Sequence, residues 1–142
     1  MEIRVAKEDD FKSIFDIRMQ TDDILEKDLI KSEIINPNYL VLVSVDKGTI
    51  VGFLSIIKNY DCADVMMIAT DINFRRRGVA ERLLIDAMEI LKKQGVKKLM
   101  LEVKEGNISA IKLYKKLGFL QISIRKKYYM GQYDAIILER AL

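Results

Sequence analysis

The sequence predicts an α/β fold in which a mixed, mostly antiparallel sheet of about six to seven strands carries helices on both faces. A length of 142 residues suits a single domain that spans residues 1–142. Short apolar runs of strand length alternate with stretches whose apolar residues recur at helical spacing. No repeat, low-complexity segment or linker divides the chain, and its only proline is Pro37.

The first half of the chain predicts a strand, two helices and three more strands. Ile3 and Val5 alternate with polar neighbours, as in a short strand. Helical spacing follows in Phe11, Ile14, Phe15, Ile17 and Arg18. A second amphipathic helix is expected over 24–35 and ends at Asn36-Pro37-Asn38. Strands are expected over 39–45, 49–57 and 62–71, with Asp46-Lys47-Gly48 as a tight hairpin turn.

The second half predicts two helices between strands. Apolar residues form a continuous helical stripe over 78–93, and Gly95 is suited to end that helix. A strand over 98–103 precedes a short helix, which Asn107 can cap and Gly118 can end. Two strands, over 119–126 and 133–139, complete the chain. The strand-helix-strand unit from 62 to 103 should be a parallel crossover, and the hairpins around it should be antiparallel.

Composition excludes several kinds of chemistry. Histidine is absent and Cys62 is the only cysteine, which removes Ser-His-Asp and Cys-His catalysis, histidine-bound metals and an internal disulfide. An enzyme of this composition has to use carboxylates, tyrosine, lysine or backbone dipoles. The net charge of +3 is lower than a dedicated nucleic-acid-binding domain needs. The chain lacks a long apolar run and the apolar core of a secretory signal, so we expect a cytoplasmic protein without membrane partners.

A candidate phosphate-binding turn joins the strand over 62–71 to the long helix. It reads Arg75-Arg76-Arg77-Gly78-Val79-Ala80. A helix N-terminus offers unpaired N–H groups and the positive end of a dipole, while Gly78 lets a ligand approach the backbone. The spacing fits neither a Walker motif nor a dinucleotide fingerprint. The alternative is that the arginines are solvated surface charges and Gly78 only shapes the loop.

One acidic residue interrupts an otherwise apolar strand. In Leu99-Met100-Leu101-Glu102-Val103, period two places Glu102 beside Met100 and away from the other three residues. A buried carboxylate is costly without a purpose, and desolvation would raise its pKa towards neutrality, as suits a general base. The alternative is a glutamate that reaches solvent or pairs with a lysine such as Lys104.

Tyr114 lies on the helix that follows this strand. A catalytic role requires its hydroxyl to share a cleft with Glu102. The alternative is a half-buried tyrosine of the core.

Several of these residues resemble motifs of the GCN5-related N-acetyltransferase (GNAT) superfamily. Arg75-x-x-Gly78-x-Ala80 is similar to its coenzyme A pyrophosphate loop, with Ala80 in place of the second glycine. The second half resembles the RimI-type branch, whose members acetylate the N-terminal alanine of a small-subunit ribosomal protein. Its matching motifs are Leu101-Glu102-Val103, Asn107, Ala110-Ile111, Leu113-Tyr114, Leu117-Gly118-Phe119, Arg125-Lys126-Lys127-Tyr128-Tyr129, Gly131 and Asp134-Ala135. The segment Met19-Gln20-Thr21-Asp22-Asp23-Ile24 lacks the Pro-Trp element usual in that branch.

The resemblance implies a role for each matching residue. The backbone of Ile68, Ala69 and Thr70 would bind the pantetheine arm and acetyl carbonyl, from a strand splayed from its parallel neighbour. The pyrophosphate would be held at Arg75, Arg76, Arg77, Gly78, Val79, Ala80 and Glu81, and Asn107 would hydrogen-bond the cofactor. Glu102 would be the base, and Tyr114 would hydrogen-bond the leaving sulfur. Tyr128 and Tyr129 would line the slot for the first residues of the substrate.

The implied activity is direct transfer of an acetyl group from acetyl-coenzyme A to the α-amine of a protein with an alanine-like or serine-like first residue, such as a ribosomal protein. An α-amine has a pKa of about 7.7–8.0 against about 10.4 for lysine, so deprotonating lysine at pH 7 is harder by about 3.4 kcal/mol. This difference favours an N-terminal acceptor.

Three alternatives stay open. The first is acetylation of a small-molecule amine or a lysine side chain, and the second is a module that binds acyl-coenzyme A without chemistry. The third is RNA binding through Arg75–Arg77 and a lysine cluster at Lys92, Lys93, Lys97 and Lys98. We expect no metal and no nucleic-acid partner, and a monomer or a weak homodimer.

Overall fold

The computed structural model describes residues 1–21, 27–129 and 131–142. Within these residues, seven strands form one sheet in the order β1-β2-β3-β4-β5-β7-β6. The strands are β1 (Glu2–Val5), β2 (Tyr39–Asp46), β3 (Thr49–Asn59), β4 (Cys62–Thr70), β5 (Lys98–Lys104), β6 (Leu120–Tyr129) and β7 (Tyr133–Ala141). The α-helices are α1 (Phe11–Arg18), α2 (Lys27–Ile35), α3 (Val79–Lys93) and α4 (Ile108–Lys116), and short 3₁₀ turns are η1 (Glu8–Asp10) and η2 (Ile72–Phe74). This order confirms the predicted α/β fold.

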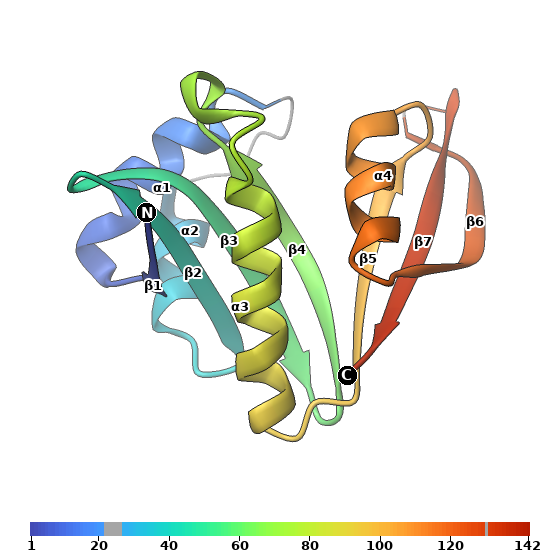
Figure 1. The fold of residues 1–142 in the computed structure, drawn as a ribbon, viewed down its shortest axis with the longest axis horizontal. Helices are drawn as coiled ribbons and strands as arrows, with labels where there is room; N and C mark the ends of the chain where they lie inside the picture. The colour runs from blue at the N-terminus through green and yellow to red at the C-terminus, as the bar shows by residue number, and fades with distance from the viewer. Residues whose placement is uncertain (22–26, 130) are drawn as a thin grey trace.

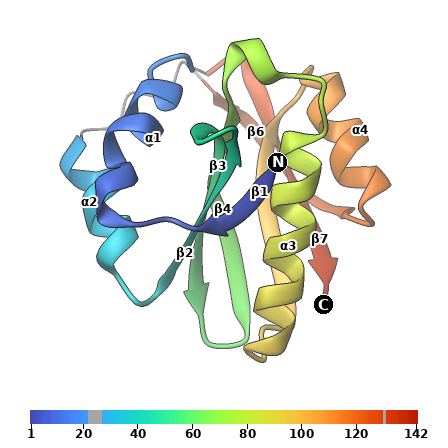
Figure 2. The same cartoon turned by 60° about the vertical axis from the view of Figure 1, so that its left-hand side comes forward.

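Two helical layers cover the sheet, one on each face (Figure 2). On the face of α3 and α4, the core contains Leu83, Leu84, Leu99, Leu101 and Tyr114 among its buried residues. A second core lies on the face of α1 and α2 and includes Ile14, Ile30, Phe53 and Met67. The chain therefore buries apolar residues on both faces of β2, β3 and β4, as a doubly covered sheet requires.

The parallel pair β4–β5 is short. Its register joins Cys62 to Lys98, Ala63 to Leu99 and Asp64 to Met100, and beyond these residues the two ribbons diverge towards the ends at which α3 and α4 begin (Figure 1). β5 continues by pairing antiparallel with β7 as far as Lys104. The splayed parallel pair that the resemblance implied is thus present.

A β-bulge lies where β4 leaves β5. Ser55 of β3 faces Met67, but the next residue, Ile56, faces Val65, so Met66 is an additional residue on β4. A bulge bends its strand and increases the local twist. The sequence offered no signal for this bulge, which accompanies the divergence of the two strands.

Most predicted turns and helix ends are confirmed by backbone geometry. Lys47 and Gly48 both have positive φ, as a two-residue hairpin turn between paired Asp46 and Thr49 requires. At the end of α3, Gly95 N–H donates to the Lys92 carbonyl and Val96 N–H to the Leu91 carbonyl, which is a Schellman motif. The predicted start of the helix over 24–35 lies outside the described residues, which resume at residue 27. The described part of this helix is α2, Lys27–Ile35.

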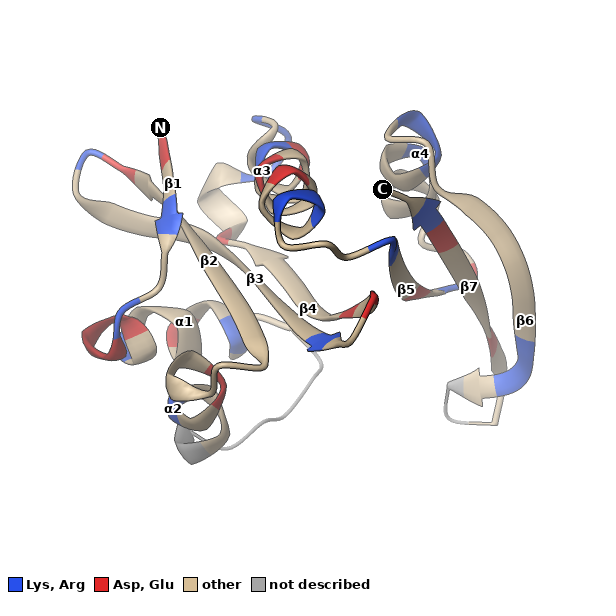
Figure 3. Ribbon diagram, turned by 90° about the horizontal axis from the view of Figure 1, so that it is seen from below, with Lys and Arg blue, Asp and Glu red and all other residues tan. Residues whose placement is uncertain are grey.

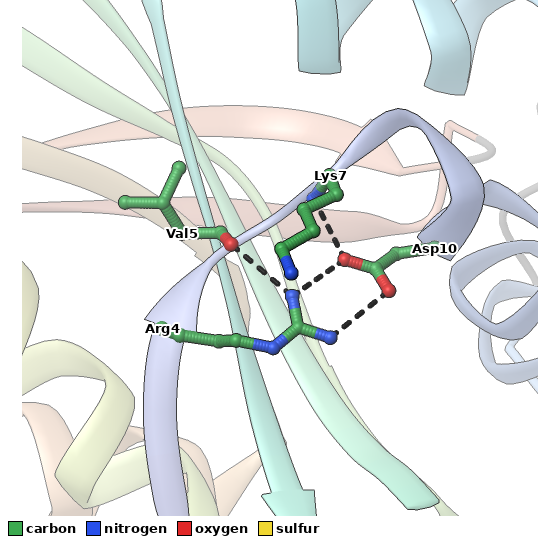
Figure 4. Close-up of polar contacts among 4 residues, drawn as sticks. All are labelled: Arg4, Val5, Lys7 and Asp10. Atoms are coloured by element: carbon green, nitrogen blue, oxygen red, sulfur yellow. Dashed lines mark hydrogen bonds and ion pairs between the residues drawn. The ribbon is translucent and has the colours of Figure 1, made fainter.

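A bidentate ion pair fixes β1 to the first helical turn (Figure 4). The Arg4 guanidinium donates to Asp10 at 2.7 and 3.0 Å, and the Lys7 backbone N–H donates to the same carboxylate at 2.7 Å. The Arg4 hydrogen bonds lower the pKa of the Asp10 carboxyl; burial opposes them and the Lys7 N–H adds to them. The contact anchors the chain before it enters α1.

Arg18 is buried at the end of α1, although the sequence places it among apolar residues of the same helix face. Its side chain is 2% exposed, lies 3.6 Å from Glu33 of α2, and donates from Nε to the Met67 sulfur at 3.0 Å. The Ser55 hydroxyl also donates to Glu33, at 3.1 Å. This buried network joins both helices of one layer to β3 and β4.

Candidate active site

The predicted phosphate-binding turn has a backbone suited to anions. Arg76 has φ of 64° and Gly78 has φ of 77°, and Gly78 is the N-cap of α3 without a side chain to bond its first-turn amides. Left-handed residues alternating with ordinary ones turn successive N–H groups into a concave, anion-binding arrangement. A Cβ on Gly78 would meet nothing within 4 Å, so the positive φ is what favours glycine there.

The arginine side chains of this turn are exposed and lie close to the turn itself. Arg75 Nε donates to the Thr70 carbonyl at 3.4 Å, and the Arg77 guanidinium lies 5.0 Å from the centre of the Phe74 ring. Val79 is buried in the core, so only its backbone is available to a ligand. Glu81 pairs with Lys116 at 3.0 Å, which links the start of α3 to the end of α4.

Gly52 of β3 lets α3 begin close to the sheet. A Cβ at this position would lie 2.6 Å from Val79 Cγ1 and 3.2 Å from the Ala69 carbonyl oxygen. The absence of a side chain therefore seats the phosphate-binding turn against the end of β4. Sequence reasoning did not single out Gly52, because the close approach comes from residues distant in sequence.

Ile68, Ala69 and Thr70 occupy the end of β4 that has diverged from β5. They pair with β3 on one side, facing Leu54, Phe53 and Gly52. The register of β5 with β4 stops at Asp64 and Met100. Since the backbone groups of a strand alternate between its two edges, some of those in Ile68–Thr70 point away from β3 and are not paired with β5 in this register.

Glu102 is exposed, and the expectation of a buried, desolvated carboxylate was wrong. The predicted alternation is correct, because Leu99, Leu101 and Val103 are buried while Glu102 is on the other face of β5. Its side chain is 33% exposed, and its Oε1 lies 3.2 Å from the Arg125 guanidinium. The partner is an arginine of β6 and not the neighbouring Lys104. In the described part of the chain, the α1–α2 layer packs mainly on β2, β3 and β4, so it leaves this face of β5 exposed at Glu102.

Tyr114 is part of the core between α4 and the sheet. It is 7% exposed, and its ring meets Phe119 edge-on with centres 5.9 Å apart. It shares a core with Leu101 and Val103, so it lies on the face of β5 opposite Glu102. The structure therefore does not bring Tyr114 and Glu102 to one face of the sheet, contrary to the expectation of a shared cleft, and a site that uses both side chains has to reach across the sheet where β4 and β5 are no longer paired, beyond Met100.

Asn107 caps α4, as predicted. Its side-chain oxygen accepts from the Ala110 backbone N–H at 3.4 Å. It also lines a surface pocket of about 350 Å³ together with Lys104, Glu105, Gly106 and Tyr133. The residue thus both caps α4 and forms part of the wall of this pocket.

The basic and aromatic run of β6 lies at an edge of the sheet (Figure 3). Tyr128 is exposed, and the Arg125 guanidinium lies 5.1 Å from the centre of its ring. Lys127 has φ of 51°, and its N–H donates to Asp134 at 2.8 Å. The side chain of Tyr129 lies outside the described residues, as do Asp22, Asp23 and Ile24 of the segment that lacks Pro-Trp.

Sequence reasoning assigned no role to Arg125, the residue that pairs with Glu102. It stood in a quoted motif, but the register that brings β6 within reach of β5 was not foreseeable from spacing.

Among the helices that the structure describes, none is long and apolar enough to span a lipid bilayer.

Comparison with known families identifies residues 3–119 as a match to the acetyltransferase (GNAT) family model. The [ribosomal protein bS18]-alanine N-acetyltransferase of Escherichia coli strain K12 is 37% identical over 103 residues, which is 70% of each chain.

Solved structures agree with this match. The crystal structure of the ribosomal-protein-S18-alanine N-acetyltransferase from Escherichia coli has a TM-score of 0.91 at 29% identity, covering 99% of this chain and 92% of that one. A putative streptothricin acetyltransferase from Bacillus anthracis, solved in complex with acetyl coenzyme A, has a TM-score of 0.70 at 29% identity and covers 76% and 65% of the two chains.

Proposed function

Because this chain belongs to the acetyltransferase (GNAT) family, we propose that it transfers an acetyl group from acetyl-coenzyme A to the N-terminal α-amine of a protein. The observation that carries the proposal is the similarity, over nearly the whole chain, to an enzyme named for acetylating a ribosomal protein at alanine. We extend that acceptor class to this chain, with alanine or serine as the first residue and the cytoplasm as the setting.

The residues present fit coenzyme A. The concave backbone at Arg76–Gly78 and the first-turn amides of α3 suit a pyrophosphate, while Arg75, Arg76 and Arg77 add positive charge around it. Backbone groups of Ile68–Thr70 that are not paired with β5 would bind the pantetheine arm and the acetyl carbonyl. Asn107, at the start of α4, would hydrogen-bond the same molecule. Acetyl-coenzyme A supplies the acetyl group as an activated thioester.

Glu102 serves as the base for the acceptor. It takes a proton from the α-ammonium group, either directly or through a water molecule, and the free amine then attacks the thioester carbonyl. An α-amine needs about 3.4 kcal/mol less than lysine for deprotonation at pH 7. A single exposed carboxylate is therefore better matched to an N-terminal acceptor.

Tyr114 acts on the leaving sulfur. A phenol, with a pKa of about 10, is a weaker acid than a thiol, with a pKa of about 8.5. Complete proton transfer from the phenol to the thiolate is therefore unfavourable unless the site changes this difference in pKa. A hydrogen bond from the Tyr114 hydroxyl is sufficient to stabilise charge that develops on sulfur. Tyr128, whose ring lies 5.1 Å from the Arg125 guanidinium, would contact the first residues of the acceptor on the side of Glu102, and the resemblance implies an acceptor-binding role for Tyr129 as well.

A panel of acceptors tests the proposal. The chain is incubated with acetyl-coenzyme A and peptides that differ only in their first two residues, beside peptides with a blocked N-terminus and an internal lysine, and beside polyamines. Mass spectrometry then locates the acetyl group. We expect acetylation at the free α-amine, fastest for alanine or serine. Acetylation only of lysine side chains or polyamines would contradict the proposal.

A further inference from the structure

The Glu102–Arg125 ion pair crosses an intervening strand. Glu102 faces Ile137 of β7, whereas Arg125 faces Ala135 of the same strand from the other side. Neighbouring strands are about 4.8 Å apart, so β5 and β6 are separated by roughly twice that distance. Two long side chains reach over β7 to bring Arg125 and Glu102 to 3.2 Å. The residue beneath this crossing, Ala135, is small and fully buried.

The guanidinium is held from a second direction by Tyr128. Regular pairing of β6 with β7 stops after Arg125 and returns at Tyr129, which faces Tyr133. Within this irregular stretch Lys127 adopts a left-handed conformation, fixed by its hydrogen bond to Asp134. The stretch brings the Tyr128 ring to 5.1 Å from the Arg125 guanidinium. Ring and carboxylate together define where the guanidinium lies.

Folding stability does not explain the pair. Its members are 57% and 33% exposed, and exposed ion pairs contribute little to the free energy of unfolding. The pair acts more directly on the orientation of the Glu102 carboxylate. Glutamate has several rotatable bonds, and an exposed carboxylate without a fixed partner samples many orientations. The contact at 3.2 Å joins Arg125 to Oε1, and a carboxylate has a second oxygen that can accept from a further donor.

We propose that Arg125 is a positioning residue for the acceptor reaction, which orients the Glu102 carboxylate so that its second oxygen faces the incoming amine. The inference rests on the proposed role of Glu102 as base and adds the residue that sets its orientation. Arginine suits this task because its planar guanidinium is rigid and stacks on an aromatic ring, whereas a lysine ammonium is a flexible point charge.

A double-mutant cycle tests the inference on the full chain, by steady-state kinetics in which the concentrations of acetyl-coenzyme A and of an N-terminal alanine peptide are each varied. We expect Arg125→Gln to lower kcat by about tenfold to a hundredfold while the KM for acetyl-coenzyme A and the melting temperature stay close to wild type. In a Glu102→Gln background, Arg125→Gln should cause no further loss of kcat. Arg125→Lys should recover part of kcat, and Lys126→Gln, which removes the neighbouring charge, should retain full activity.

Three results would overturn the inference. An equal loss from Arg125→Gln with and without Glu102 would mean that Arg125 acts independently of the carboxylate. A rise in the acceptor KM at unchanged kcat would make Arg125 a binding residue. Wild-type kcat in Glu102→Gln alone would remove the base assignment of the proposed function, and this inference with it. The first two outcomes leave the proposed function standing.

Discussion

Glu102 points to the face of the sheet opposite α3 and α4 because strand alternation fixes its direction. Its neighbours Leu101 and Val103 point into the core of α3 and α4, so the carboxylate points to the other face. The same alternation separates it from Tyr114, which is buried in that core. In the proposed reaction the base and the sulfur-binding phenol therefore approach the thioester from opposite faces of the sheet.

The first prediction concerns the base. Glu102→Gln keeps the shape of the side chain but removes its ability to take a proton, so kcat should fall by about a hundredfold or more. Initial rates at saturating acetyl-coenzyme A measure the effect. Glu89→Gln, an exposed carboxylate on α3, is the matched control and should retain full activity. Full turnover in Glu102→Gln would refute the assignment.

The second prediction concerns Tyr114. Tyr114→Phe retains the ring that packs against Phe119 and removes only the hydroxyl. Loss of a hydrogen bond to developing charge should lower kcat by roughly tenfold to a thousandfold, with little change in the affinity for acetyl-coenzyme A. Steady-state kinetics and calorimetry separate the two quantities. A loss of affinity at unchanged kcat would instead make Tyr114 a binding residue.

At the scale of elements, the seating of α3 on β3 decides where the phosphate-binding turn lies. Gly52 and Val79 are in contact only because one of them has no side chain. Gly52→Ala places a methyl group 2.6 Å from Val79 Cγ1, so the Val79 side chain or the start of α3 has to shift. Overpacking of this kind costs about 1–3 kcal/mol of folding free energy.

The third prediction follows from this contact. Gly52→Ala should lower the melting temperature and raise the KM for acetyl-coenzyme A more than the KM for the acceptor. The double variant Gly52→Ala/Val79→Ala restores the space and should recover the cofactor KM. If both variants bound acetyl-coenzyme A as the wild type does, the position of the turn would not depend on this contact.

The fourth prediction concerns the join between β1 and the first helix. In the folded chain, hydrogen bonds from Arg4 hold the pKa of Asp10 below its unfolded value of about 3.9. The pair therefore adds stability that is fully present above that value and is lost as the pH falls through the folded pKa. Asp10→Asn should destabilise the chain by roughly 1–2 kcal/mol at pH 7, and this deficit should shrink below about pH 4.

Urea unfolding at both pH values measures this difference. Asp9→Asn, at the exposed neighbouring position, is the control and should behave as the wild type. A deficit of Asp10→Asn that stayed constant down to low pH would show that the Asp10 charge is not its source.

At the scale of the whole molecule, local signals predicted most of the architecture and long-range contacts produced the rest. Apolar periodicity, Asn107 and Gly95 predicted the helices and their ends, and the Asp46–Gly48 turn predicted a hairpin. The bulge at Met66 and the seating at Gly52 depend on how distant strands and helices meet, which periodicity does not encode.

The site was predictable to the same extent. Motif resemblance located its residues, and alternation gave the direction of Glu102. Its exposure and its pairing with Arg125 depend on the register of β5, β7 and β6 and on where the helical layers end. The network of Arg18, Glu33 and Ser55 likewise required the packing of two helices on the sheet.

The most direct test of the account is a crystal structure of the chain with a bisubstrate analogue, in which an acetyl linker joins the sulfur of coenzyme A to the amine of an alanine peptide. We expect the linker to pass between the diverging ends of β4 and β5, with the peptide amine beside Glu102 and the sulfur beside the Tyr114 hydroxyl. An analogue bound wholly on one face of the sheet, with either side chain remote from the linker, would contradict it.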